Sequence, residues 1–321
     1  MIHTQQGLIQ LQSLDLDAKV RMSQERIRAW YDYFDGDVYV AFSGGKDSTV
    51  LLHLVRSIYP NVPAVFHDTG VEFPEIREFV RTFENVVRTK PKKTFRQVIE
   101  EYGYPLVSKR VAQYVHEAGG CESMRHLRTT GIKKDGTFSP KSRISTCWQR
   151  LIDAPFKVSD QCCKVLKHRP SEVYEKITGQ HGYVGTMASD SEQRALTWKR
   201  FGCNAFDAKQ PVSKPLSFWT EADIWKFIRA HGIKTSNIYD MGYSRTGCIF
   251  CGFGVHMSSP NRFQLLQETH PKLWEYAMKP WSEGGLGMAE PLEFIGVEVR
   301  SQMRLFKAGL LDGEANEGIE R

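Results

Sequence analysis

The sequence predicts an α/β fold in which helices cover both faces of a parallel sheet. Two observations predict this class. Short apolar runs rich in strand-forming residues alternate with helical segments of about ten residues, a pattern typical of βαβ units. In addition, the stretch 41–55 joins a strand to a helix through a glycine-rich turn. With 321 residues, the chain is long enough for one large domain or two small ones.

The elements follow from residue patterns along the chain. The expected strands are apolar runs rich in strand-forming residues, at 37–42, 62–68, 85–89 and 181–187. The expected helices carry apolar residues at spacings of three and four, at 14–35, 49–59, 73–83, 221–231 and 260–278. We expect residues 312–321 to be frayed, and we find no internal repeat.

The composition is that of a globular chain, with 41% hydrophobic and 25% charged residues. No run approaches 18 apolar residues, so no membrane span or membrane contact is expected. Residues 1–13 lack the basic and apolar regions of a secretory signal, and a cytoplasmic location is therefore expected. In that reducing compartment the seven cysteines are expected to be thiols or metal ligands.

Positive charge is concentrated in one stretch. The net charge is +6, and residues 124–150 contain seven Lys or Arg but only one acidic residue, Asp135. The stretch shows no clear period, so we expect a long basic loop. It is either a solvated loop or a contact surface for a polyanion.

The stretch "SGGKDS", residues 43–48, has the composition of a phosphate site. Gly44 and Gly45 let the backbone approach an anion, and Lys46 adds a positive charge. The start of the following helix offers free N–H groups and the positive end of its dipole. The hydroxyl donors are Ser43, Ser48 and Thr49. The stretch matches neither the Walker A pattern nor G-x-G-x-x-G.

These residues carry a resemblance. "SGGKDS" resembles the PP-loop of the ATP pyrophosphatase superfamily. Three further segments resemble its phosphoadenylyl and adenylyl sulfate reductase branch: 66–75, 185–195 and 214–228. The resemblance spans about residues 36–255. It implies a Rossmann-like sheet of the adenine nucleotide alpha hydrolase type, with ATP or a related nucleotide at the carboxyl ends of the strands.

The resemblance also implies individual roles. Lys46 and Arg194 would offset phosphate charge, and Asp47 would hold Mg²⁺ or orient the loop. The full nucleotide-binding set is Ser43, Gly44, Gly45, Lys46, Asp47, Ser48, Asp68, Thr69, Gly185, Ser191 and Arg194. Two of these have alternative interpretations: Asp68 as a turn residue and Arg194 in a surface ion pair.

The expected domain organisation has three parts. Residues 1–35 form a helical N-terminal extension, and residues 36–255 form the nucleotide-binding domain. This domain includes a basic insertion near 119–150. Residues 256–321 form a helical C-terminal extension.

Four cysteines form a ligand pattern. Cys162 and Cys163 are adjacent, and Cys248 and Cys251 form C-x-x-C. Four thiolates suffice for a [4Fe–4S] cluster or for zinc, and the remaining alternative is four unrelated buried thiols. The pattern resembles that of the iron–sulfur adenylyl sulfate reductases, which favours the cluster. Lys167 matches a basic position of those reductases, but Leu166 stands in place of their arginine.

One departure from the reductases changes the expected reaction. Those enzymes use a cysteine in a C-terminal tail, and residues 252–321 contain none. The sequence therefore resembles two groups of relatives that use ATP for sulfur insertion. These are the tRNA thiolases and the cluster-bearing ATP pyrophosphatases of DNA phosphorothioation systems, and the second group is the closer one. Cys147, between Arg143 and Arg150, is interpreted either as a persulfide carrier or as an ordinary half-exposed cysteine.

The expected enzyme splits ATP·Mg²⁺, transfers AMP to an acceptor oxygen and releases pyrophosphate, after which sulfur displaces AMP. The expected partners are nucleic acid, DNA before tRNA, and a separate cysteine desulfurase; a homodimer is left open. Two alternatives stay open. One is an adenylyl or phosphoadenylyl sulfate reductase whose thiol comes from another chain or from Cys147. The other is a non-catalytic nucleotide-sensing or DNA-binding subunit.

Overall fold

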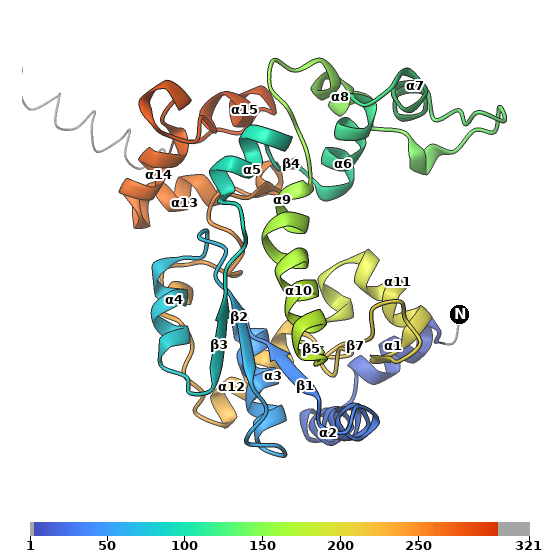
Figure 1. The fold of residues 1–321 in the computed structure, drawn as a ribbon, viewed down its shortest axis with the longest axis vertical. Helices are drawn as coiled ribbons and strands as arrows, with labels where there is room; N and C mark the ends of the chain where they lie inside the picture. Colours follow the sequence, from blue (N-terminus) through green and yellow to red (C-terminus); the bar gives the residue numbers. More distant parts are fainter. Residues whose placement is uncertain (1–2, 301–321) are drawn as a thin grey trace, which may run out of the picture. The chain divides into compact units, whose positions relative to one another are not determined.

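A computed structural model of the chain describes residues 3–300 (Figure 1). The predicted frayed end, 312–321, lies outside the described residues. The chain divides into two compact units. Unit 1 comprises Met1–Pro91 and Lys167–Thr246, and unit 2 comprises Lys92–Leu166 and Gly247–Arg321. The domain boundaries expected near residues 35 and 255 do not coincide with these units, because the chain leaves the first unit after Pro91 and returns to it at Lys167.

Unit 1 is built on a six-stranded sheet with the order β3-β2-β1-β5-β7-β6. All neighbouring pairs are parallel except β6 with β7, which confirms the predicted α/β class. The strands are β1 (Val38–Ala41), β2 (Ala64–His67), β3 (Val86–Thr89), β5 (His181–Val184), β6 (Asn204–Ala205) and β7 (Val212–Ser213). The four strands predicted from the sequence are β1, β2, β3 and β5, and they occupy the first four positions in this order.

Helices cover both faces of this sheet. The helices of unit 1 are α1 (Gln5–Gln12), α2 (Leu16–Tyr33), α3 (Lys46–Arg56), α4 (Pro74–Arg81), α10 (Arg169–Thr178), α11 (Glu192–Phe201) and α12 (Glu221–Ala230). On one face, α2, α3 and α12 pack together, and the Tyr183 hydroxyl of β5 donates to the Ile27 carbonyl of α2. On the other face, the Tyr39 hydroxyl of β1 donates to Glu175 of α10 at 2.8 Å.

Local sequence explains where these helices begin. Asp15 caps α2 by accepting a hydrogen bond from the Ala18 amide, so the predicted helix at 14–35 is confirmed with slightly shorter bounds. Helix α3 begins at Lys46, three residues before the predicted start. The hydroxyls of Ser48 and Thr49 donate to the Gly45 carbonyl, which places both residues inside the first turns of α3.

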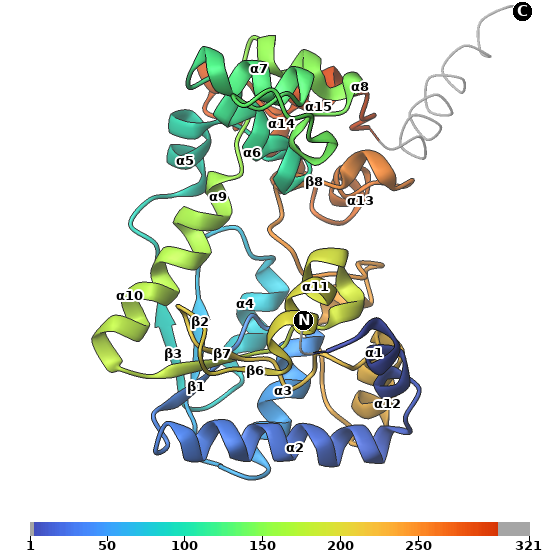
Figure 2. The same cartoon turned by 90° about the vertical axis from the view of Figure 1, so that its right-hand side faces the viewer.

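Unit 2 combines helices with a two-stranded parallel sheet of β4 (Leu106–Val107) and β8 (Gly252–Phe253), shown in a second view in Figure 2. Its helices are α5 (Phe95–Tyr102), α6 (Lys109–Ala118), α7 (Glu122–Thr130), α8 (Thr146–Gln149), α9 (Gln161–Cys163), α13 (Arg262–Thr269), α14 (Pro271–Met278) and α15 (Ala289–Phe294). Within the described residues, this unit holds the basic stretch and all four predicted cysteine ligands.

Two expectations for this unit are wrong. The single helix predicted at 260–278 is two helices that meet at His270, because Pro271 has no N–H group with which to continue the first. The basic stretch at 124–150 is not one long loop, since its first residues belong to α7, which ends at the left-handed Gly131. In neither unit is a helix of the described residues long and apolar enough to cross a membrane.

Candidate functional site

The glycine-rich loop lies where the strand order of unit 1 changes direction. The chain runs from β1 outward to β2 and β3, and then returns to β5 on the other side of β1. Ligands of α/β sheets bind at such a switch point, outside the carboxyl ends of the strands. Gly185, just after β5, lies against the loop: a Cβ there would be 3.0 Å from the Asp47 carbonyl oxygen. Two predicted segments therefore meet here.

The two glycines of the loop are also required by packing. Gly44 has a φ of +72°, and a Cβ there would lie 2.8 Å from Val80 and 2.9 Å from Ile76 of α4. A Cβ on Gly45 would lie 2.5 Å from the Thr246 hydroxyl. The sequence suggested that these glycines let an anion approach, and the structure adds that neighbouring side chains already crowd them.

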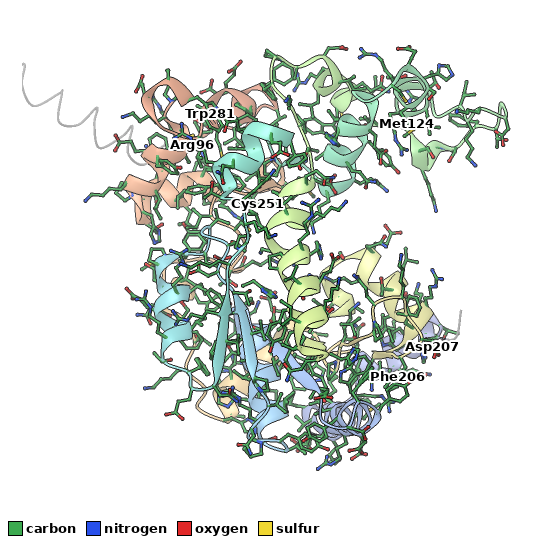
Figure 3. The ribbon with its side chains drawn as sticks, in the orientation of Figure 1. Arg96, Met124, Phe206, Asp207, Cys251 and Trp281 are labelled. Carbon is green, nitrogen blue, oxygen red and sulfur yellow. The ribbon has the colours of Figure 1, made fainter. Side chains whose placement is uncertain are left out.

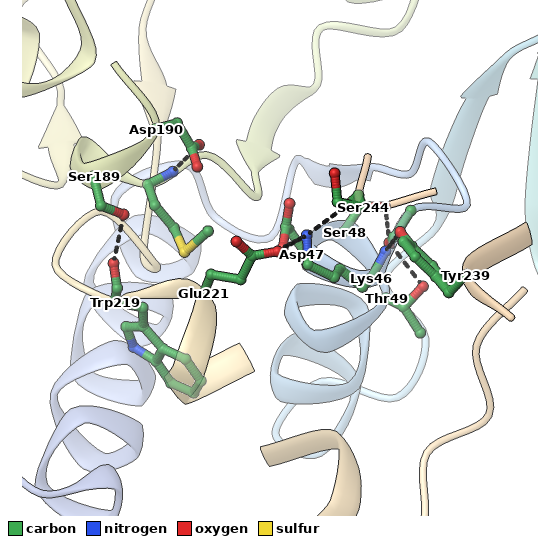
Figure 4. Close-up of polar contacts among 12 residues, drawn as sticks. Lys46, Asp47, Ser48, Thr49, Ser189, Asp190, Trp219, Glu221, Tyr239 and Ser244 are labelled. Carbon is green, nitrogen blue, oxygen red and sulfur yellow. Dashed lines mark hydrogen bonds and ion pairs between the residues drawn. The ribbon is translucent and has the colours of Figure 1, made fainter. Parts of the chain in front are cut away.

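Lys46 is held between two carboxylates (Figure 4). Its Nζ lies 3.2 Å from Glu221 Oε1 and 3.5 Å from Asp47 Oδ1, and the side chain is only 5% exposed. Burial lowers the pKa of Lys46, but the two carboxylates outweigh burial and raise it overall. The ammonium is therefore charged and locally neutralised in the ligand-free chain.

The first amide of α3 also has a partner. The Lys46 backbone N–H donates to the Tyr239 hydroxyl at 2.7 Å, and Lys46 Nζ donates to the Ser244 carbonyl at 3.4 Å (Figure 4). Tyr239 ends the short helix Asn237–Tyr239. Neither Tyr239 nor the role of Glu221 was predictable from the sequence, because no local motif marks them and only the tertiary fold brings them to Lys46.

Asp47 stands in a strongly acidic environment. Burial raises the pKa of Asp47; Lys46 opposes this rise, and the carboxylates of Asp190 and Glu221 add to it. Asp47 Oδ1 is buried and accepts no hydrogen bond. A cation bound here would relieve the repulsion between these carboxylates.

Arg194 forms an ion pair with Asp190, one turn earlier in the chain. Asp190 also accepts a hydrogen bond from the Met187 amide at 3.1 Å, and Ser191 caps α11. The surface ion pair, one of the two interpretations of Arg194, is therefore present in the ligand-free chain. The arginine side chain is 47% exposed, so an anion can still reach it from solvent.

At the carboxyl end of β2, Asp68 and Thr69 have local partners. Thr69 contacts the Glu72 carboxylate through its amide and hydroxyl, and Asp68 pairs with Arg77 at 2.5 Å. Asp68 also accepts a hydrogen bond from the Gly70 amide at 3.4 Å, as the turn interpretation predicts. Both residues lie at the predicted strand end, but their polar groups are engaged within the turn.

His67, which the sequence did not single out, is the last residue of β2. Its Nδ1 lies 2.5 Å from the Thr89 hydroxyl, and its Nε2 is buried without a hydrogen-bond partner. Burial, with a smaller effect of Lys167, lowers the pKa of His67 to about 4. The imidazole is therefore neutral at neutral pH.

The four predicted cysteine ligands gather within unit 2; Cys251 is labelled in Figure 3. A hydrogen bond with Cys163 and then burial raise the pKa of Cys162, and the thiols of Cys248 and Cys251 add to the rise. Burial raises the pKa of the Cys251 thiol, and the Arg262 guanidinium, which donates to the Cys248 carbonyl at 2.7 Å, opposes this rise. Arg262 is a neighbour that the sequence pattern did not reveal.

The donor chemistry of this group fits an iron–sulfur cluster. In residues 3–300, no three His, Cys, Asp or Glu side chains are arranged to hold a metal ion. A [4Fe–4S] cubane requires a wider arrangement of ligands than a single metal ion does, because each of its four thiolates binds a separate iron atom. The four thiols are near enough to affect one another's ionisation, and Arg262 lies beside Cys248, so the donor set is of the type that a cluster uses.

The other cysteines lie apart from this pattern. Cys147 and Cys121 are exposed, and Cys203 is buried in unit 1. Cys147 contacts the Ser145 hydroxyl at 3.3 Å. Unit 2 also contains a cavity of about 490 Å³ whose lining includes Tyr104, Phe156 and Trp281 but none of the predicted site residues. One face of Trp281 is covered by Arg96 at 4.8 Å (Figure 3).

Comparison with known families assigns the chain. The model of the phosphoadenosine phosphosulfate reductase domain matches residues 37–134 and 133–252. This chain belongs to that family. The matched residues include the loop at 43–48 and all four cysteines of the predicted ligand set. The family assignment confirms the coarse part of the predicted resemblance, the reductase-like branch of the PP-loop superfamily.

Several curated proteins are similar to this chain over about three quarters of its length. Adenosine 5'-phosphosulfate reductases from Lysinibacillus sphaericus and a Staphylococcus epidermidis strain are 22% and 24% identical. These alignments cover 74% and 78% of this chain, and 83% and 85% of the relatives. An uncharacterized protein from Methanocaldococcus jannaschii is 25% identical over 78% of this chain, which spans only 42% of that protein.

Among solved structures, the phosphoadenylyl-sulfate reductase from Candida auris, in a phosphate complex, matches with a TM-score of 0.42 and 15% identity. The match covers 77% of this chain and 97% of the reductase. The family assignment rests on the sequence match and on the sheet topology of unit 1, not on this superposition.

Proposed function

We propose that the chain is an ATP pyrophosphatase that adenylylates an acceptor oxygen on a nucleic acid, DNA before tRNA, so that sulfur can replace that oxygen. The observation that carries the proposal is the environment of Lys46. A buried lysine at the start of α3 stands between two carboxylates at the switch point of the sheet. This arrangement suits a nucleotide that arrives with a divalent cation.

The acidic groups favour ATP·Mg²⁺ over a metal-free adenylyl sulfate. Mg²⁺ in nucleotide sites is typically bound by one or two carboxylates together with substrate phosphates and water. Asp47 is the first candidate ligand, and Asp190 and Glu221 are close enough to affect its ionisation. A cage of three protein side chains is not needed, because the phosphates complete the coordination.

The proposed first step is attack of the acceptor oxygen on the α-phosphorus of ATP. The bond between the α-phosphorus and the bridging oxygen to the β-phosphorus breaks, AMP stays on the acceptor, and pyrophosphate carries the electron pair away. Lys46, the loop amides and Arg194 would offset the negative charge that develops on the phosphates. Arg194 would exchange its ion pair with Asp190 for one with a phosphate.

The proposed second step is attack by a sulfide-level sulfur atom, which displaces AMP and leaves sulfur in place of oxygen. This exchange is redox-neutral when the donor sulfur is at the oxidation state of hydrosulfide. A persulfide donor, such as a cysteine desulfurase makes, would need two electrons from a thiol reductant to reach that state. Cys162, Cys163, Cys248 and Cys251 would hold a [4Fe–4S] cluster, which would supply a sulfur-binding or electron-transfer centre.

The main alternative is reduction of adenylyl sulfate, the activity for which the relatives from Lysinibacillus sphaericus and Staphylococcus epidermidis are named. That reaction requires a thiol to take the sulfur, and residues 252–321 contain no cysteine. A thiol from another chain or from Cys147 would meet the requirement. A nucleotide-sensing subunit is the second alternative, and it would bind ATP without releasing pyrophosphate.

Product analysis separates these functions. Protein purified without oxygen is incubated with ATP·Mg²⁺ or with adenylyl sulfate, with and without DNA or tRNA. We expect pyrophosphate from ATP when DNA or tRNA is present, with an equal amount of AMP attached to the nucleic acid until a sulfur donor is added. Sulfite from adenylyl sulfate together with no pyrophosphate from ATP would establish the reductase instead.

A further inference from the structure

The basic stretch of unit 2 contains a β-hairpin, residues 131–139, between α7 and α8 (Figure 1). The Lys133 amide donates to the Thr137 carbonyl at 3.0 Å, and the Ser139 amide donates to the Gly131 carbonyl at 2.8 Å. These two bonds flank a bridge between Ile132 and Phe138. In such a pair the two side chains lie directly opposite each other on one face of the hairpin.

This apolar pair faces solvent. Phe138 is 57% exposed and Ile132 is 39% exposed, although both would be stabilised by burial. The Phe138 ring lies against the backbone of its own hairpin, since a Cβ on Gly131 would lie 3.0 Å from the ring. An exposed aromatic ring on a short hairpin is available to stack on a flat partner.

The charges around the pair identify the kind of partner. Within residues 3–300, no ion pair involves the exposed Lys133, Lys134, Lys141 or Arg143. By contrast, two other arginines of the basic stretch are already neutralised. Arg128 donates to Glu117 at 2.9 Å, and Arg125 pairs with Asp153 at 2.5 Å. The unneutralised charge is therefore concentrated on the hairpin and the segment that follows it.

The one acidic residue of the hairpin does not cancel this charge by pairing with a lysine. Asp135 instead accepts a hydrogen bond from the Thr137 amide at 2.9 Å and so helps to form the turn. Alternation along the strands places Lys133 and Thr137 on the face opposite Ile132 and Phe138. The hairpin thus presents an aromatic ring on one face and ammonium groups on the other face and at the tip.

We propose that this hairpin binds single-stranded nucleic acid, with Phe138 stacked on an unpaired base and the lysines against the phosphates. A ring can lie on a base only where the face of that base is open, as it is in a single strand and not within a stacked duplex. This inference rests on the proposed function for the identity of the acceptor, which would then present an unpaired segment. The binding itself needs no nucleotide in the loop of unit 1.

Fluorescence anisotropy of a labelled single strand and of the matching duplex tests the proposal, with no ATP present. DNA and RNA strands of the same sequence show which of the two nucleic acids the hairpin prefers. Phe138→Leu removes the ring but keeps an apolar partner for Ile132, and Phe138→Trp keeps a ring. Ile177→Ala, at a position 78% exposed on α10, is the control for loss of exposed apolar surface.

We expect Phe138→Leu to weaken single-strand binding by about fivefold to a hundredfold, the usual range for a base–aromatic stack. Duplex binding should change by less than about twofold, and Phe138→Trp should bind single strands as the unmodified chain does, with quenching of its fluorescence by the bound base. The control should have no effect.

Wild-type single-strand affinity of Phe138→Leu, or an equal loss for single strand and duplex, would overturn the proposal. Circular dichroism of each variant shows whether the fold is retained, and the tryptophan variant reports stacking without any loss of side-chain volume. Pyrophosphate release from ATP is measured separately. A chain that stacks bases through Phe138 but releases no pyrophosphate would refute the proposed function and leave this inference standing.

Discussion

The Tyr239 hydroxyl lies 2.7 Å from the backbone nitrogen of Lys46 and accepts the hydrogen bond of the first amide of α3. Amides at a helix start are the donors that bind phosphate in nucleotide sites. In the ligand-free chain the Tyr239 oxygen therefore accepts the hydrogen bond from the Lys46 amide that a phosphate oxygen would otherwise accept. Nucleotide binding would exchange this bond for one to phosphate.

Tyr239→Phe tests this exchange. The variant should lose about 0.5–1.5 kcal/mol of stability without ligand, because one neutral hydrogen bond is removed. If phosphate replaces the bond in the complex, the complex loses nothing, and ATP should bind about twofold to tenfold more tightly. Calorimetric titration with a non-hydrolysable ATP analogue checks the affinity. Equal destabilisation of the free and bound forms would show that Tyr239 keeps its bond when nucleotide is present.

Asp47→Ala should abolish pyrophosphate formation and leave the fold intact. The carboxylate lies beside Lys46, and one of its oxygens is buried without a hydrogen bond, so the substitution removes the proposed Mg²⁺ ligand. Asp17→Ala is the matched control, since Asp17 is an exposed acid in the first turn of α2. Wild-type turnover by Asp47→Ala would show that this loop is not the active site.

The cysteine proposal predicts brown protein when oxygen is excluded. Iron and acid-labile sulfide should each be present at about four per chain, as for a cubane on four thiolates. Cys251→Ser should lower both contents, while Cys121→Ser, at an exposed position outside the pattern, should leave them unchanged. One zinc per chain and no iron would show that the four cysteines bind zinc and not a cluster.

The basic residues around the hairpin should set the salt dependence of nucleic-acid binding. Changing Lys133, Lys134, Lys141 and Arg143 together to Ala should reduce the slope of log K against log salt by roughly three units. ATP binding should be unaffected. A variant that loses four exposed basic residues of unit 1 controls for net charge: Arg21, Lys176, Lys226 and Arg229. An unchanged slope in the variant of Lys133, Lys134, Lys141 and Arg143 would show that these residues form a solvated segment that does not contact nucleic acid.

His67 should make stability depend on pH. Its pKa is about 4 in the folded chain and near 6.5 when unfolded, so the unfolded chain takes up the proton first. The stabilisation is complete above pH 6.5 and is lost as the pH falls from there toward 4, with about 2 kcal/mol gone at pH 5. Urea denaturation of wild type and His67→Gln at pH 7 and pH 5 measures this. An equal loss in both proteins would assign the pH dependence to other groups.

The sequence predicts unit 1 well because its signals are local. The strand runs, the amphipathic helix at α2 and the glycine loop each lie within one short segment, and β1, β2, β3 and β5 form as expected. The partners of Lys46 could not be predicted in this way. Tyr239 lies 193 residues from Lys46 in the chain, and Glu221 and Asp190 are also distant, so only the tertiary fold brings them to the loop.

The division into units was missed for a related reason. The second unit is formed by residues 92–166 together with the chain from 247 onward. The two segments pair through β4 and β8, and each of these strands is only two residues long. Such short strands give no periodic signal. The helix break at Pro271 was readable from the sequence, since proline interrupts the bonding of a preceding helix.

The proposed function requires the chain to transfer AMP from ATP to a nucleic acid. Its most direct test is to incubate anaerobic protein with [α-³²P]ATP, Mg²⁺ and single-stranded DNA, with no sulfur donor. Label should become attached to the DNA, an equal amount of pyrophosphate should appear, and added sulfide should release the label as AMP. Label that stays off the nucleic acid while adenylyl sulfate yields sulfite, or cleavage of ATP to ADP and phosphate, would contradict it.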